Sequence, residues 1–197
     1  MANGPRFRRH AGIAAPFLRS HVELEVIAPL VPEMHMHGHG PHPPAPHPHQ
    51  HPIRPGVDEH PGQHCFEGLR YFSDGAENPE FVLNQAAYRN ASILIAGAQF
   101  VLGGLQAFAV MRLLGCGMRA VIAPSFGPVF YEDCFVYGLL PVTLGPDAIA
   151  TLVSATAVDP MVTTTIDLER EVVEHPRMPA IGFSLNPRLR SNLLSGN

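Results

Sequence analysis

The sequence predicts a single mixed α/β domain with a small mixed sheet, a βαβαβ core and a β-rich periphery. Short apolar runs that suit buried strands alternate with helical stretches between residues 92 and 144, and parallel strands are joined by such crossover helices. The chain of 197 residues, of which 46% are hydrophobic, is long enough for one packed core. We therefore expect residues 1–197 to form one domain.

The middle of the chain gives the clearest order of elements. We expect a strand over residues 92–96, a helix over 105–114, a strand over 119–123, a helix from a cap at Ser125 to residue 137, and a strand over 139–144. Gly117 and Gly138 are typical helix stops, because glycine adopts the left-handed conformation without a Cβ clash. Three strands joined by two helices require right-handed crossovers, so we expect parallel strands.

Weaker patterns flank this core. Residues 10–31 alternate in places as half-buried strands do, and residues 147–156 favour a further helix. The β-rich runs that follow cover residues 162–166, 171–173 and 181–185. Histidine, proline and glycine instead dominate residues 32–64, a composition that opposes packing. We expect this tract to be a mobile loop.

Composition excludes several classes of function. The basic residues are all arginine, which rules out a lysine Schiff base or a lysine general base. A net charge of −4 gives no reason to expect nucleic acid as a partner, and no apolar run has the roughly 20 residues that cross a bilayer. Cys65, Cys116 and Cys134 form no CxxC pair, which indicates a reducing, cytoplasmic compartment.

Several stretches between Asn78 and Leu144 resemble the small subunit of isopropylmalate dehydratase, the swivel domain of the aconitase superfamily. The matching stretches are Asn78–Asn84, Ala91–Ala96, Arg119–Phe126, Phe130–Tyr131, Cys134–Phe135 and Gly138–Val142. The resemblance implies an aconitase-type swivelling β/β/α domain. It also implies a hydro-lyase in which this chain closes over a 4Fe–4S cluster on a large subunit, with a small carboxylic acid as substrate. We expect the chain to bind no cofactor of its own and to be inactive when isolated.

The segment that carries catalysis in that family is replaced in this sequence. Where the family has Phe-Gly-Cys-Gly-Ser-Ser-Arg-Glu-His-Ala, this chain has Phe100–Ala109. The two serines fall on Gly104 and Leu105 and the arginine on Gln106. The resemblance implies a serine that removes a proton from a substrate carbon and arginines that grip carboxylates. The catalytic residue of this chain is therefore unknown, and Gly103, Gly104 and Gln106 remain as positions expected to bind substrate.

Two further substrate-binding positions follow from the resemblance. The family's Asn-x-Asp-Thr-Asp motif matches His21–Glu25, so Glu25 keeps a carboxylate at the last acidic position. The family's specificity loop is replaced by the histidine–proline tract. Within that tract Ile53–Gly56 is the nearest match to the family's Arg-Thr-Gly, which makes Arg54 the expected substrate arginine.

The histidine–proline tract has a chemistry of its own. His35, His37 and His39 alternate along the chain, so in an extended backbone they lie on one face and can share Ni²⁺, Zn²⁺ or Cu²⁺. The alternatives are solvated histidines without a ligand, or a histidine that replaces the missing serine as a base.

Two functions from different classes remain open. The first is the small subunit of an isopropylmalate dehydratase-like hydro-lyase with divergent substrate or chemistry. The second is a non-catalytic paralogue that acts in assembly and binds divalent metal through its histidine-rich loop.

Overall fold

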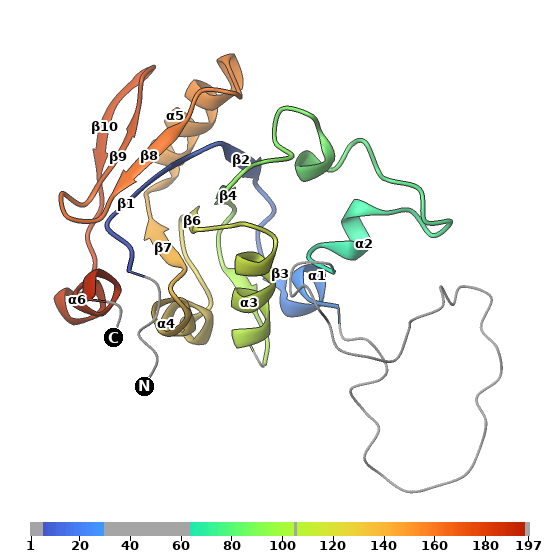
Figure 1. Ribbon diagram of the computed structural model, residues 1–197, viewed down its shortest axis with the longest axis horizontal. Helices are drawn as coiled ribbons and strands as arrows, with labels where there is room; N and C mark the ends of the chain where they lie inside the picture. Colours follow the sequence, from blue (N-terminus) through green and yellow to red (C-terminus); the bar gives the residue numbers. More distant parts are fainter. Residues whose placement is uncertain (1–5, 30–63, 105, 196–197) are drawn as a thin grey trace, which may run out of the picture.

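The computed structural model describes residues 6–29, 64–104 and 106–195, and its centre is a parallel sheet. The strands lie in the order β2 (Ala14–Phe17), β4 (Ile93–Ala96), β6 (Ala120–Ala123) and β7 (Leu140–Thr143). Helices α3 (Ala107–Gly115) and α4 (Pro128–Tyr137) make the crossovers from β4 to β6 and from β6 to β7. The βαβαβ succession expected from the sequence is confirmed (Figure 1).

A second, antiparallel sheet lies beside the first. Its order is β1 (Arg9–Gly12), β8 (Thr164–Asp167), β9 (Val172–His175) and β10 (Met178–Gly182). The chain passes from β1 directly into β2 and so joins the two sheets (Figure 1). Parallel and antiparallel pairs both occur, as expected, but they belong to separate sheets rather than to one mixed sheet.

The remaining described elements are short, apart from two helices. A two-stranded parallel sheet pairs β3 (Val22–Glu23) with β5 (Phe100–Leu102). The other elements are α1 (Leu24–Ile27), α2 (Glu67–Arg70), the 3₁₀ helix η2 (Val82–Asn84), α5 (Pro146–Val158) and α6 (Pro187–Ser195). Neither β5 nor α6 was expected from the sequence pattern.

Two apolar cores form on opposite faces of the parallel sheet. In β4, Leu94 and Ala96 pack on the side of α1 and α3, whereas Ile93 and Ile95 pack towards the antiparallel sheet and α5. All four residues of β4 are fully buried, as the continuous apolar run predicted. The sheet is therefore held from both faces, and its carboxyl edge is a fixed platform.

Helix α4 begins differently from the prediction. Its N-cap is Gly127 rather than Ser125, and Pro128 takes the first helical position, where proline needs no hydrogen bond. The Ser125 hydroxyl instead accepts a hydrogen bond from the Gln99 backbone N–H at 2.9 Å. The predicted stop at Gly138 is confirmed by its left-handed φ of 83°.

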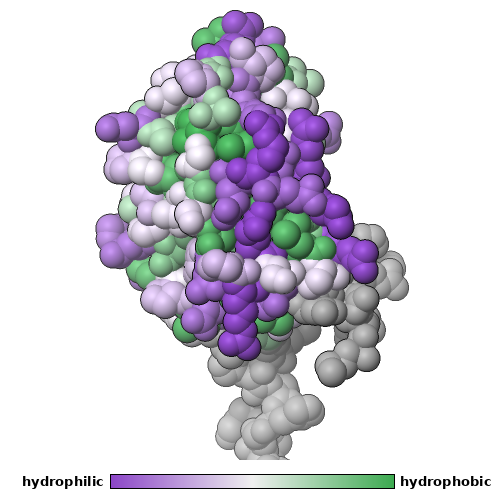
Figure 2. Space-filling model, turned by 90° about the vertical axis from the view of Figure 1, so that its left-hand side faces the viewer, coloured by the Kyte–Doolittle hydropathy of each residue, from purple (hydrophilic) through white to green (hydrophobic). Residues whose placement is uncertain are grey.

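The surface is mixed in character. On the side where β10 and α6 lie, hydrophilic residues surround scattered apolar patches (Figure 2). Among the described residues, none of the helices combines the length and hydropathy that a membrane span needs.

Candidate active site

The predicted site lies at the carboxyl edge of the parallel sheet, where two connections meet. The chain leaves β4 through residues 97–99 into β5, and it leaves β6 through residues 124–127 into α4. Phe100 N–H donates to Ser125 O at 3.0 Å, and Gly127 N–H donates to Phe100 O at 3.0 Å. Ligands of open parallel sheets bind at this edge. The fold therefore places the start of the segment Phe100–Ala109, which differs from the family's catalytic segment, where a ligand site is expected.

The turn after β5 is open. Gly103 and Gly104 are both exposed, and Gly103 has a φ of +105°, which favours glycine. Beyond its chain neighbours, a Cβ added at Gly104 would meet no heavy atom of the described residues within 4 Å. Position 104 therefore has room for a side chain, but glycine provides none.

The turn is entered through strained backbone. Val101 is fully buried and has a φ of 59°, a conformation that costs a β-branched residue on the order of 1–3 kcal/mol. The family to which the sequence was compared has a glycine at this position. Val101 therefore holds a backbone conformation that a glycine would adopt without strain.

Gln106 points into the fold rather than towards the open turn. Its side chain donates to Gly103 O and accepts from the backbone N–H of Phe130, and the residue is only 4% exposed. Phe130 lies in the first turn of α4, where backbone N–H groups lack partners within the helix. Gln106 thus joins the two connections, and its amide is not offered to a ligand.

Glu25 lies next to the open turn. Strand β3 pairs with β5, with Val22 opposite Phe100, and a Cβ on Gly103 would lie 4.0 Å from the Cβ of Leu24. Glu25 follows on α1 and is exposed. The structure therefore brings Glu25, Gly103 and Gly104 to one edge.

The other predicted site residues lie outside the described residues. These are Leu105, Arg54, His35, His37 and His39. Among the residues that the structure does describe, no three histidine, cysteine, aspartate or glutamate side chains gather to hold a metal.

The start of α3 can favour an anion. No side chain caps this end of the nine-residue helix, and its first turn holds no acidic residue. Its backbone N–H groups and the helix dipole favour negative charge. The arrangement can hold a carboxylate beside the exposed Gly103–Gly104 backbone, with Glu25 on the neighbouring helix α1.

Sequence reasoning missed a polar cluster that shapes the segment after residue 64. Arg70 Nη1 donates to Asn84 Oδ1 at 3.0 Å, and Asn84 Nδ2 donates to the carbonyls of Arg70 and Asn78 at 2.7 and 2.8 Å. Arg70 also lies 5.7 Å from the ring centroid of Phe81. Both asparagines belong to the matching stretch Asn78–Asn84, but their partner Arg70 lies outside it.

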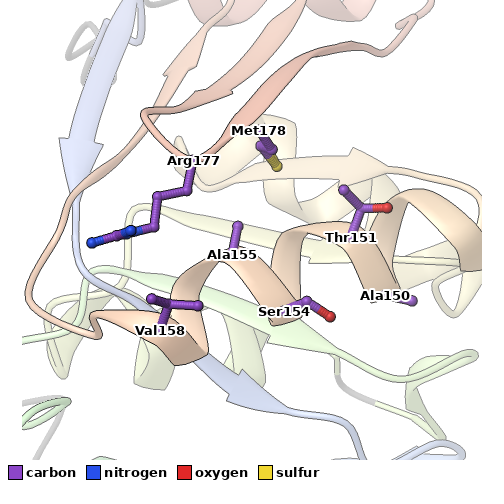
Figure 3. A pocket seen from close by; sticks show the side chains of 7 residues that line it. All are labelled: Ala150, Thr151, Ser154, Ala155, Val158, Arg177 and Met178. Atoms are coloured by element: carbon purple, nitrogen blue, oxygen red, sulfur yellow. The ribbon is translucent and has the colours of Figure 1, made fainter.

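A separate hollow lies between α5 and the β9–β10 hairpin. Its volume is about 600 Å³, and Ser154, Val158, Arg177 and Met178 are among the residues that line it (Figure 3). Of the predicted site residues that the structure describes, none lines it.

Known proteins resemble this chain in sequence and in fold. Residues 62–147 match the aconitase C-terminal domain. The 3-isopropylmalate dehydratase small subunit of Rhodospirillum centenum is 43% identical over 135 residues, which cover 68% of this chain and 66% of that protein. The counterpart from Paramagnetospirillum magneticum is 38% identical, with 68% and 67% covered.

The chain spans just under two thirds of the length of the R. centenum protein and of the Rhodospirillum rubrum relative, 66% and 65% respectively. The crystal structure of 3-isopropylmalate dehydratase from Methanocaldococcus jannaschii superimposes with a TM-score of 0.58 at 20% identity. That match covers 94% of this chain and 87% of the other. The predicted aconitase-type fold is confirmed.

Proposed function

Because this chain belongs to the family of 3-isopropylmalate dehydratase small subunits, we propose that it is the swivel-type subunit of a cytoplasmic, heteromeric hydro-lyase with divergent substrate or chemistry. The proposal rests on one observation at the carboxyl edge of the parallel sheet, namely a turn without the side chains that the family uses there. A turn is present where the family has its catalytic segment, but Gly104 offers no side chain and the amide of Gln106 is hydrogen-bonded within the fold.

The proposed substrate is a small carboxylic acid. The exposed backbone of Gly103 and Gly104 and the start of α3 would bind a carboxylate, and Glu25 would hold or take a proton beside it. Arg54 is the further residue proposed to bind substrate. On binding, the large subunit would contribute a 4Fe–4S cluster with a Lewis-acid iron.

The usual dehydration of 3-isopropylmalate is expected to be slow in such a complex. A positioned general base contributes about 10²–10⁴-fold to rate, and Gly104 has no proton acceptor. The guanidinium that would grip a carboxylate is also missing at Gln106.

Assembly is the first test. The full chain is mixed anaerobically with a cluster-loaded large subunit of the isopropylmalate dehydratase type, and the mass of the product is measured by size-exclusion chromatography with light scattering. The proposal predicts a stable heteromer. A chain that stays free beside every large subunit tried, while the R. centenum small subunit assembles, would contradict it.

The second candidate is a non-catalytic paralogue that acts in assembly and binds divalent metal through His35, His37 and His39. The same empty turn favours it, because a chain without chemistry needs no side chain there. Calorimetric titration with Ni²⁺, Zn²⁺ and Cu²⁺ separates the two functions. Stoichiometric, submicromolar binding that is abolished by replacing the three histidines with alanine would support the paralogue, and its absence would exclude this metal function.

A further inference from the structure

A serine and a histidine from different sheets touch through their side chains. Ser92 Oγ and His10 Nε2 lie 2.7 Å apart, within hydrogen-bond distance. His10 lies on β1 of the antiparallel sheet, and Ser92 directly precedes β4 of the parallel sheet. The pair therefore lies at the amino edge of the parallel sheet, opposite the carboxyl edge that carries the candidate active site.

The backbone holds both residues in place. Ser92 N–H donates to Ile13 O at 3.1 Å, and Ser92 O accepts from Arg119 N–H at 2.8 Å. His10 lies on its strand opposite the fully buried Ile166. The hydroxyl and the imidazole are therefore positioned by regular elements of two sheets, which is what a reacting pair requires.

The pair occupies the space that a side chain would fill on β1. A Cβ added to Gly12 would lie 2.0 Å from Ser92 Oγ and 3.1 Å from His10 Nε2. Glycine at this position is therefore what leaves room for the contact. Ser92 and His10 are both half-buried, so the pair is neither sealed in the core nor fully hydrated.

The surroundings of His10 keep its imidazole neutral. Burial lowers the pKa of His10 below its ordinary value of 6.5, and the positive charge of Arg119 lowers it further. At pH 7 the ring is therefore uncharged, and with its proton on Nδ1 it presents a lone pair at Nε2 to the Ser92 hydroxyl. A hydroxyl that is hydrogen-bonded to a neutral imidazole is the arrangement in which histidine activates serine as a nucleophile.

We propose that Ser92 is an acylation site that takes acyl groups from activated esters of small carboxylic acids, with His10 as its general base. Ser92 Oγ forms a bond to the ester carbonyl carbon while its proton passes to His10 Nε2. The bond from that carbon to the leaving oxygen then breaks, and the leaving group takes the proton from His10. The products are an acyl-serine and a free alcohol or phenol, and the imidazole is neutral again.

The test is the reaction of the full chain with p-nitrophenyl acetate. The reaction is stopped with acid after increasing times, and the peptide that contains Ser92 is followed by mass spectrometry. The chain contains no lysine, so this common acceptor of acyl groups does not compete. The proposal predicts an acetyl group on Ser92, formed at least about 10²-fold faster than on Ser191, which is an exposed serine on α6.

Two variants separate a base from a structural hydrogen bond. His10→Gln keeps a side-chain group that can hydrogen-bond to Ser92 but cannot take up its proton, and it should slow acetylation by about 10²-fold or more. Ser191→Ala is the matched control and should leave the rate at Ser92 unchanged.

The pH profile of the wild-type chain gives a readout that needs no variant. Neutral His10 is the form that acts as a base, so the rate should rise with pH as the ring loses its proton. Because its pKa lies below 6.5, the rate should level off by about pH 7.5.

Three results would overturn the proposal. One is wild-type protein in which Ser92 is acetylated no faster than Ser191. Another is a His10→Gln variant that is folded by circular dichroism and reacts at the wild-type rate. The third is a wild-type rate that keeps rising in proportion to hydroxide above about pH 7.5, as expected for a hydroxyl without a base. The wild-type measurements decide the matter even if a variant fails to fold.

Discussion

Two connections leave the same edge of the parallel sheet, and they differ in how fully they are packed. Residues 124–127 are filled: a Cβ on Gly127 would lie 1.9 Å from Val101 O. Residues 103–104 are open: both are exposed, and a Cβ on Gly104 would meet no described atom within 4 Å beyond its chain neighbours. Gln106 links the two regions by accepting from Phe130 N–H. The comparison teaches that the connection through Gly127 is closely packed against the rest of the fold, whereas the turn at Gly103 and Gly104 is exposed and leaves room for side chains that it does not have.

The largest expected effect comes from adding one methyl group to each connection. Gly127→Ala forces a side chain against backbone, which cannot move like a flexible side chain, and should lower the free energy of unfolding by about 3 kcal/mol or more. Gly104→Ala should change it by less than about 0.5 kcal/mol. Urea unfolding followed by circular dichroism measures both. Equal effects of the two substitutions would remove the contrast between the connections.

The link between the connections gives the next largest effect. Gln106→Leu leaves the buried Phe130 N–H without an acceptor, and we expect a loss of about 1–3 kcal/mol in the free energy of unfolding. The control is Gln85→Leu on the surface, where the side chain makes only one long hydrogen bond of 3.4 Å. If Gln106→Leu is as stable as wild type, the glutamine does not cap α4.

The smallest effect concerns pH and lies in the packed part of the fold. Burial lowers the pKa of His10 and of His175 below 6.5, with added effects of Arg119 and Arg177 respectively. Below pH 6.5 the unfolded chain then binds more protons than the native chain, so stability should fall as the pH falls. Above pH 6.5 we expect His10 and His175 to cause no loss of stability.

Chemical denaturation between pH 7.5 and pH 5 measures this dependence. The His10→Asn, His175→Asn double variant should show a flatter decline than wild type. An identical decline in both proteins would mean that other groups, outside these two histidines, set the pH dependence.

The sequence predicted the parts of the fold that depend on local pattern. The buried runs at β4, β6 and β7 and the glycine stops at Gly117 and Gly138 are properties of a few adjacent residues. The pairing of β3 with β5 could not be read in this way, because its partners lie more than 70 residues apart and both strands are short. The membership of β1 in the antiparallel sheet was missed for the same reason, because β1 pairs with β8 more than 150 residues further along the chain.

The candidate site was predictable in its position and less so in its contacts. The resemblance of Phe100–Ala109 to the family's catalytic segment pointed to the turn, and the structure places Glu25 on α1 directly after Leu24, which lies beside Gly103. The roles of these residues stay predictions. The inward direction of Gln106 depends on Phe130, which is 24 residues away. Sequence spacing alone carries no signal for this contact.

The most direct test of the account is the rate of dehydration of 3-isopropylmalate by the reconstituted complex. Wild-type chain, Gly104→Ser and the R. centenum small subunit are each assembled with the same cluster-loaded large subunit. The account predicts that the wild-type complex is at least about 10²-fold slower than the R. centenum complex and that Gly104→Ser recovers part of the difference, because the added hydroxyl fits the open space. A wild-type rate equal to that of the R. centenum complex would contradict the claim that the open turn has changed the chemistry.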